Sequence, residues 1–161
     1  GYKNIKIAWV GDGNNVVNSW INAASVLGFD LIVACPDNYS VNPHIIHTAS
    51  VKDKSNIVFT NDPKEAVKNA DVIYTDVWAS MGDENELSKR IIAFKGFQVN
   101  KDLLSRAKQD VMVMHCLPAH RGEEISEDVL EDENNVFWDQ AENKRHMHKA
   151  ILESLILGPI K

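Results

Sequence analysis

Short apolar runs alternate along the chain with longer segments whose apolar residues recur at helical spacing. The runs at residues 5–10, 31–34, 57–60, 71–77 and 111–116 predict buried strands, and a shorter run at 136–138 predicts a last one. Helices are predicted from the turn at 11–13 to Gly28, over 43–50, from 62 onward, and over 87–94, 101–108, 127–130 and 141–157. This alternation predicts one α/β domain, residues 1–161, with a mostly parallel sheet and helices on both faces in three layers.

Polar residues at the predicted helix starts support these boundaries. The clearest start is Asp62-Pro63-Lys64-Glu65, where Asp62 can cap the helix, Pro63 suits its first position and Glu65 can close a capping box. We expect Asn100 and Ser126 to cap the short helices that follow them. Gly28 and Gly158 are expected to end their helices.

Composition narrows the class of protein. The 161 residues fit one domain, and a net charge of −6 without a Lys/Arg cluster argues against binding of duplex nucleic acid. No apolar run is long enough to span a bilayer. Cys35 and Cys116 form no CxxC pair, so we expect a reducing, cytoplasmic compartment. The chain begins Gly-Tyr-Lys without Met, so we expect a piece of a longer protein.

Three polar loops follow predicted strands, at residues 11–15, 76–82 and 115–122. In parallel α/β sheets ligands bind beyond the carboxyl ends of the strands, so these loops should share one edge. The first loop, Gly11-Asp12-Gly13-Asn14-Asn15, has Val16 where a dinucleotide fingerprint needs its third glycine. Either a simple tight turn or an anion site at a helix start fits this loop.

Asp76 and Cys116 are the candidate chemical groups of the other two loops. Asp76 ends an apolar strand, where it fits either a turn-capping residue or a carboxylate that pairs with a ligand ammonium; Ser80 and Met81 follow it. Cys116 fits a buried structural thiol or a substrate contact. Alternation along the strand turns His115 to the opposite face, which argues against a papain-like nucleophile.

We predict no metal site and no cofactor. His115, Cys116 and His120 match no standard zinc spacing, and no second ligand pair completes them. We therefore interpret the histidines of this chain as surface or capping side chains.

Several segments in a fixed order resemble a known family. They are Val10-Gly11-Asp12-Gly13-Asn14-Asn15, Tyr74-Thr75-Asp76-Val77-Trp78, Ser80-Met81-Gly82, Phe97-Gln98-Val99-Asn100, His115-Cys116-Leu117-Pro118 and Asp139-Gln140-Ala141-Glu142-Asn143. The chain resembles, almost end to end, the C-terminal, ornithine-binding domain of ornithine carbamoyltransferases, a Rossmann-like domain. That family transfers the carbamoyl group of carbamoyl phosphate to the δ-amine of L-ornithine, giving L-citrulline and phosphate.

The resemblance implies roles for particular residues in ornithine binding. Asn15 would contact the main-chain groups of ornithine, and Asp76, Ser80 and Met81 would hold its α-amino end. Cys116 would lie beside the δ-amine as the catalytic residue and proton acceptor.

Carbamoyl phosphate would contact Cys116 and Lys144. It would also contact the backbone carbonyl of Leu117. The family has arginine at the position of Lys144, and here Arg145 follows it. One residue turns a helix by about 100°, so we prefer Lys144 as the replacement. The family's Ser-x-Arg-Thr-Arg and His-Pro-x-Gln motifs are absent, which implies that the carbamoyl phosphate domain lies outside this chain and that the chain alone is inactive.

Two alternatives remain at the level of the sequence. One is a carbamoyltransferase for another amine, such as putrescine or acetylornithine, and the other is a non-catalytic Rossmann-like binding module. The resemblance further implies a homotrimeric full-length enzyme whose subunit contacts lie mainly in the other domain, so that this piece is expected to be a monomer.

Overall fold

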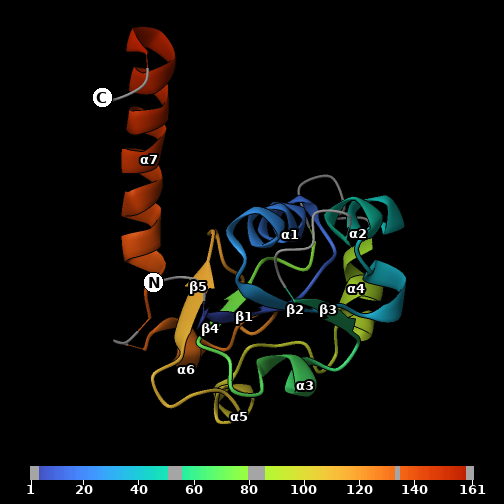
Figure 1. Cartoon of the computed structure of the whole chain (residues 1–161). Helices are drawn as coiled ribbons and strands as arrows, with labels where there is room; N and C mark the ends of the chain where they lie inside the picture. The colour runs from blue at the N-terminus through green and yellow to red at the C-terminus, as the bar shows by residue number, and fades with distance from the viewer. Residues whose placement is uncertain (1–3, 51–55, 80–85, 133–134, 159–161) are drawn as a thin grey trace.

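A computed structural model describes residues 4–50, 56–79, 86–132 and 135–158. Within them, five parallel strands form one sheet in the order β3-β2-β1-β4-β5 (Figure 1). The strands are β1 (Lys6–Val10), β2 (Asp30–Ala34), β3 (Ile57–Thr60), β4 (Val72–Thr75) and β5 (Met112–His115). The predicted α/β class is confirmed, and the five longer apolar runs contain these five strands apart from the first residue of β2.

The central strands are buried on both faces of the sheet. Every residue of β4, and every residue of β1 and β2 except the first of each, is buried, whereas the edge strands β3 and β5 are partly exposed. Continuous apolar runs are the expected sequence of such strands, because helices cover both sides of a parallel sheet.

Helices cover both faces of the sheet, as predicted (Figure 1). One face carries α1 (Asn15–Leu27) and α2 (Pro43–Ser50), above a core that includes Trp9, Ile21 and Leu31. The other carries α3 (Pro63–Val67), α5 (Lys101–Leu104) and α6 (Glu127–Leu130), above a core that includes Ile73 and Phe137. The short turn η2 (Asp37–Tyr39) follows β2, and α4 (Leu87–Ala93) lies beyond the β3 side of the sheet in Figure 1.

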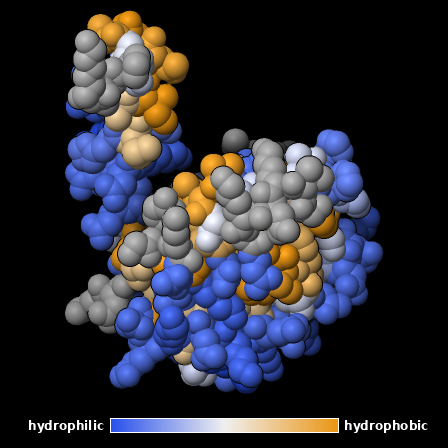
Figure 2. Space-filling view, in the orientation of Figure 1, coloured by the Kyte–Doolittle hydropathy of each residue, from blue (hydrophilic) through white to orange (hydrophobic). Residues whose placement is uncertain are grey.

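The final helix, α7 (Phe137–Leu157), projects from the body of the domain. Its first residue, Phe137, is fully buried, but most of its later residues are exposed. The far end of α7 carries a hydrophobic surface that is visible in Figure 2. No helix in the described parts of the chain combines the length and apolar character that a membrane span requires.

The predicted strand at 136–138 is wrong, since Phe137 opens α7. The side chain of Asn135 accepts a hydrogen bond from the backbone N–H of Phe137 at 3.3 Å. Three apolar residues fit a strand, but they fit the buried first turn of a helix equally well. The predicted helices at 141–157 and 101–108 are also corrected, the first beginning earlier, at Phe137, and the second ending at Leu104.

The predicted caps are only partly confirmed. Asp62 accepts from the backbone N–H of Lys64, and Asn100 from that of Leu103. Glu65 does not close a capping box: its carboxylate accepts from the hydroxyl of Thr60, which in turn accepts from the N–H of Asp62. Ser126 occupies the cap position, but its hydroxyl bonds to the Asp128 carboxylate and makes no capping bond.

Candidate functional site

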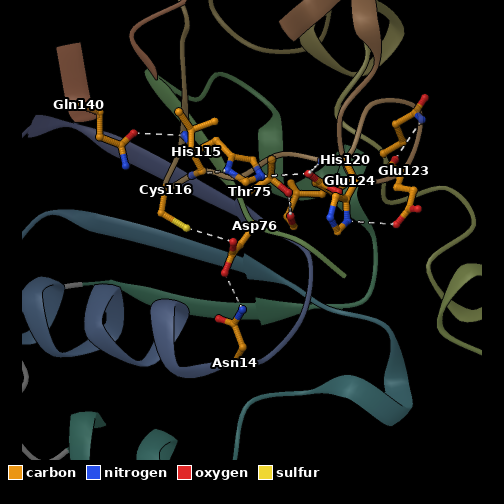
Figure 3. Close-up of polar contacts among 12 residues, drawn as sticks. Asn14, Thr75, Asp76, His115, Cys116, His120, Glu123, Glu124 and Gln140 are labelled. Carbon is orange, nitrogen blue, oxygen red and sulfur yellow. Dashed lines mark hydrogen bonds and ion pairs between the residues drawn. The ribbon is translucent and has the colours of Figure 1, made fainter. Parts of the chain in front are cut away.

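The candidate site lies where the sheet reverses its order. Chain connections lead from β1 to β2 and β3 on one side, and from β4 to β5 on the other. Loops that leave β1 and β4 therefore diverge and open a crevice at the carboxyl ends of these strands, the usual ligand position in such sheets. The predicted edge is confirmed by contacts between the three loops (Figure 3).

Asn14 joins the first loop to the second. Its side-chain oxygen accepts from the backbone N–H groups of Val16 and Val17 and so caps α1, while its amide nitrogen donates to Asp76 Oδ2 at 2.9 Å. Sequence reasoning gave the ligand contact to Asn15 and overlooked Asn14, although an Asn directly before a helical apolar pattern is a capping signal. Asn15 is the exposed first residue of α1 and lines a hollow of about 350 Å³ together with Trp20 and Tyr74.

Asp76 is the central group of the site. It is only 6% exposed and accepts from two neutral donors, the Asn14 amide and the Cys116 thiol, the latter at 3.0 Å. Within the described residues no lysine or arginine pairs with this carboxylate. A buried carboxylate is stable when its charge is matched, so the arrangement is suited to a ligand cation.

Cys116 follows β5 and faces Asp76 (Figure 3). Burial raises the pKa of its thiol to about 12, and the hydrogen bond to Asp76 and the charge of that carboxylate act in the same direction. The thiol is therefore protonated at neutral pH in this arrangement. Burial, followed by the proximity of Cys116, also raises the pKa of the neighbouring Tyr74 hydroxyl.

His115 shapes the loop that carries Cys116. It is 1% exposed, and its Nδ1 accepts from the backbone N–H of Leu117 at 2.8 Å. Its Nε2 therefore carries the proton and donates to Glu124 Oε1 at 3.0 Å. Glu124, fully buried, also accepts from the backbone N–H of His120 at 2.7 Å. The predicted opposite orientation of His115 and Cys116 agrees with these contacts, but the expectation of a surface histidine is wrong for His115.

Comparison with known proteins places this geometry in a family. Residues 3–155 match the family model described as aspartate/ornithine carbamoyltransferase, Asp/Orn binding domain. The ornithine carbamoyltransferase of Geobacter metallireducens is 54% identical over 155 residues, which are 96% of this chain and 51% of that protein. The chain belongs to the aspartate/ornithine carbamoyltransferase family.

Solved structures of the carbamoyltransferase family agree with this assignment. The ornithine carbamoyltransferase structure from Pyrococcus furiosus matches with a TM-score of 0.89 at 50% identity, covering 99% of this chain and 52% of that one. The anabolic enzyme structure from Campylobacter jejuni matches with a TM-score of 0.90 at 39% identity, covering 94% of this chain and 51% of that one. The chain thus spans about half the length of the relatives it matches.

Among the described residues, the remaining predicted residues of this carbamoyltransferase domain make no side-chain hydrogen bond or ion pair with Asp76. Leu117 follows Cys116 directly and is half-buried. Lys144 is exposed on α7, one turn beyond Gln140, whose side chain bonds to the backbone N–H of His115 and to the Tyr74 hydroxyl. Arg145 is paired with Glu142 at 3.0 Å.

Ser80 and Met81, which were predicted to hold the ligand's α-amino end, lie outside the described residues.

The described residues contain two groups of three side chains, and in each group the three possible metal-ligand atoms lie within 4.8 Å of one another. In the group of Asp76, His115 and Cys116, both ring nitrogens of His115 are already hydrogen bonded. In the group of His120, Glu123 and Glu124, one Glu124 oxygen already accepts two hydrogen bonds. The hydrogen bonding of the first group leaves no histidine nitrogen for a metal.

Proposed function

We propose that this chain is the ornithine-binding half, residues 1–161, of an enzyme that transfers the carbamoyl group of carbamoyl phosphate to the δ-amine of L-ornithine. The observation that carries this proposal is the buried Asp76 carboxylate, which lies at the reversal point of the sheet and, among the described residues, accepts hydrogen bonds from neutral donors only. It is supported by the names of the similar proteins, which are ornithine carbamoyltransferases.

Asp76 is proposed to bind the α-ammonium group of ornithine. Such a charge-assisted bond in a buried place is about twice as strong as a neutral one. Asn15 stands at the N-terminal end of α1, where the helix dipole favours the ligand carboxylate. Ser80 and Met81 are proposed to complete the contacts to the amino-acid end, which distinguishes ornithine from putrescine and from acetylornithine.

Cys116 is proposed to lie beside the δ-amine. In the reaction this amine attacks the carbonyl carbon, a C–N bond forms, the C–O bond to phosphate breaks and the amine releases a proton. The Cys116 thiol can accept that proton only after it has lost its own. An ammonium group bound to Asp76 cancels the charge that helps to raise the thiol pKa, so ornithine itself favours the thiolate.

Carbamoyl phosphate is proposed to contact the backbone carbonyl of Leu117, the Cys116 side chain and Lys144. Charge that develops on the phosphate needs further cationic donors, and the whole chain contains only four arginines. We therefore assign these donors to the half of the enzyme that this chain does not span.

We also propose a homotrimer for the complete enzyme. One relative is named as anabolic, which supports a biosynthetic role.

The test is citrulline formation by the full-length natural protein that contains this chain. With carbamoyl phosphate present, kcat/KM for ornithine is expected to exceed that for putrescine and for acetylornithine by about a hundredfold or more, because buried polar groups left unpaired reject analogues that lack their partner. The purified 161-residue chain is expected to give no citrulline. A preference for either analogue would overturn the assignment of the substrate.

A further inference from the structure

The guanidinium group of Arg90 contacts both of the loops that carry Asn14 and Asp76. Arg90, on α4, is 8% exposed. Its Nη1 donates to the backbone carbonyl of Trp78 at 2.7 Å and lies 3.2 Å from Asp12 Oδ2. Its Cζ stands 4.7 Å from the centroid of the Tyr39 ring. One side chain therefore contacts a carboxylate, a carbonyl and an aromatic face at once.

These contacts reach both loops of the proposed ornithine site. Asp12 lies two residues before Asn14, which caps α1 and donates to Asp76. Trp78 lies two residues after Asp76. Because Arg90 bonds to both segments, it fixes the spacing of their backbones close to the point where Asn14 and Asp76 meet.

The first loop has little freedom to adjust if this contact is lost. The backbone N–H of Gly13 donates to the Tyr39 carbonyl at 2.8 Å, and a Cβ on Gly13 would lie 2.5 Å from the carbonyl carbon of Ser40. Removal of the guanidinium takes away the cation that lies 3.2 Å from the buried Asp12 carboxylate, and loss of one partner of a buried ion pair is destabilising. The Asp12–Asn14 segment then loses one of the contacts that fix its position.

We propose that Arg90 is a positioning residue for ornithine, acting through Asp12 and Trp78 on the Asn14–Asp76 contact; this inference rests on the proposed function. The loop that carries Leu117 is held separately, by His115, Glu124 and Gln140. Loss of Arg90 is therefore expected to weaken ornithine binding more than the contacts to carbamoyl phosphate, of which only Cys116 bonds to Asp76.

The experiment uses the full-length enzyme and the variants Arg90→Met and Arg90→Lys, with separate KM values for the two substrates. Arg90→Met is expected to raise KM for ornithine by about tenfold or more, which corresponds to about 1.4 kcal/mol of binding free energy. KM for carbamoyl phosphate is expected to stay within about twofold of the wild-type value. Arg90→Lys keeps the charge but lacks the planar fork, so its effect is expected to be smaller than that of Arg90→Met.

Two further variants separate positioning from loss of stability. Asp12→Asn is expected to raise KM for ornithine and to add little to Arg90→Met, because both changes break one ion pair. Val129→Ala creates a cavity beneath α6, at a buried residue that shares a core with Trp78 but is not among the Arg90 contacts given above. It is expected to lower the melting temperature and to leave KM for ornithine unchanged.

Three outcomes overturn the inference: equal changes in both KM values, a rise in KM for ornithine in Val129→Ala, or an unchanged KM for ornithine in both Arg90 variants. If Arg90→Met does not fold, Arg90→Lys and Asp12→Asn decide the question by the same two KM values. A wild-type enzyme that forms no citrulline overturns the proposed function and this inference with it. An active wild type with unaffected Arg90 variants overturns this inference alone.

Discussion

The fold raises the pKa of the Cys116 thiol, as it also raises those of Cys35 and Tyr74. The Cys116 pKa of about 12 stands about three units above the ordinary value of 9.0. Because each unit is a factor of ten, the thiolate fraction at neutral pH is about a thousandfold below that of a free cysteine. We predict correspondingly slow alkylation of Cys116 by iodoacetamide up to about pH 9. Peptide mass spectrometry distinguishes Cys116 from Cys35 in this measurement.

Asp76→Asn tests the cause of that shift. The Asp76 hydrogen bond and charge both raise the Cys116 pKa, so their removal is expected to lower it and to speed alkylation several-fold at pH 8. Cys35 is the internal control. Burial and the Asp12 charge raise its pKa to about 12, and its alkylation rate should be the same in both proteins. Equal rates for Cys116 in both proteins would contradict the proposed influence of Asp76.

We predict that Glu124 stabilises the fold mainly as a hydrogen-bond acceptor and only to a small extent through its charge. Glu124→Ala leaves the His115 Nε2–H and the His120 N–H without their acceptor in a buried place. Since each such loss costs about 1–3 kcal/mol, the free energy of unfolding should fall by about 2–6 kcal/mol in urea titrations.

Glu124→Gln keeps the carbonyl acceptor and is expected to cost less than about 1 kcal/mol. Glu123→Ala, at a partly exposed neighbour, is the matched control and should cost still less. A Gln variant as unstable as the Ala variant would show that the charge of Glu124 is essential.

At the scale of elements, the start of α1 combines a structural and a functional contact in Asn14. Asn14→Ala removes the cap and is expected to cost about 1 kcal/mol of unfolding free energy at any pH. Asn14→Asp keeps a capping oxygen but places a second carboxylate against Asp76. The like charges raise the pKa of the pair, so this variant should be destabilised at pH 8 and recover as the pH falls toward 5.

Urea unfolding at pH 5 and pH 8 measures this difference between the two Asn14 variants. If the free energy of unfolding of Asn14→Asp is the same at pH 5 and pH 8, the close contact between Asn14 and Asp76 is contradicted.

The sequence allowed the strands and the site edge to be predicted because both depend on local signals. Apolar runs of four to seven residues mark the strands, and polar residues directly after them mark the loops. The start of α7 was missed because a run of three apolar residues, Val136, Phe137 and Trp138, is too short to distinguish the spacing of a strand from that of a helix. Arg90, Glu124 and Gln140 were not predicted as parts of the site because their partners lie far away or on another element, and no local pattern indicates such contacts.

At the scale of the whole molecule, α7 projects from the body of the domain and exposes most of its residues. Met147, Ile151 and Leu155 recur at four-residue spacing on one side of it and are all at least 49% exposed. The chain spans about half the length of its relatives, so we expect this stripe to pack against the other half of the full-length protein.

Hydrogen exchange tests this expectation in the isolated chain and in the full-length protein. Amides of α7 beyond Gln140 should exchange quickly in the isolated chain, while those of α1 stay protected, and the full-length protein should protect both. Equal exchange of α7 in both proteins would contradict this packing.

The central claim is that Asp76 binds the α-ammonium group of ornithine. The most direct test compares the binding of ornithine and of 5-aminopentanoate, which lacks only the α-amino group, to the full-length enzyme with and without Asp76→Asn. We predict that the wild type prefers ornithine by about ten- to a hundredfold, as a hydrogen bond to a charged group contributes about 1.5–3 kcal/mol, and that Asp76→Asn abolishes this preference. An undiminished preference for ornithine in Asp76→Asn would contradict the account.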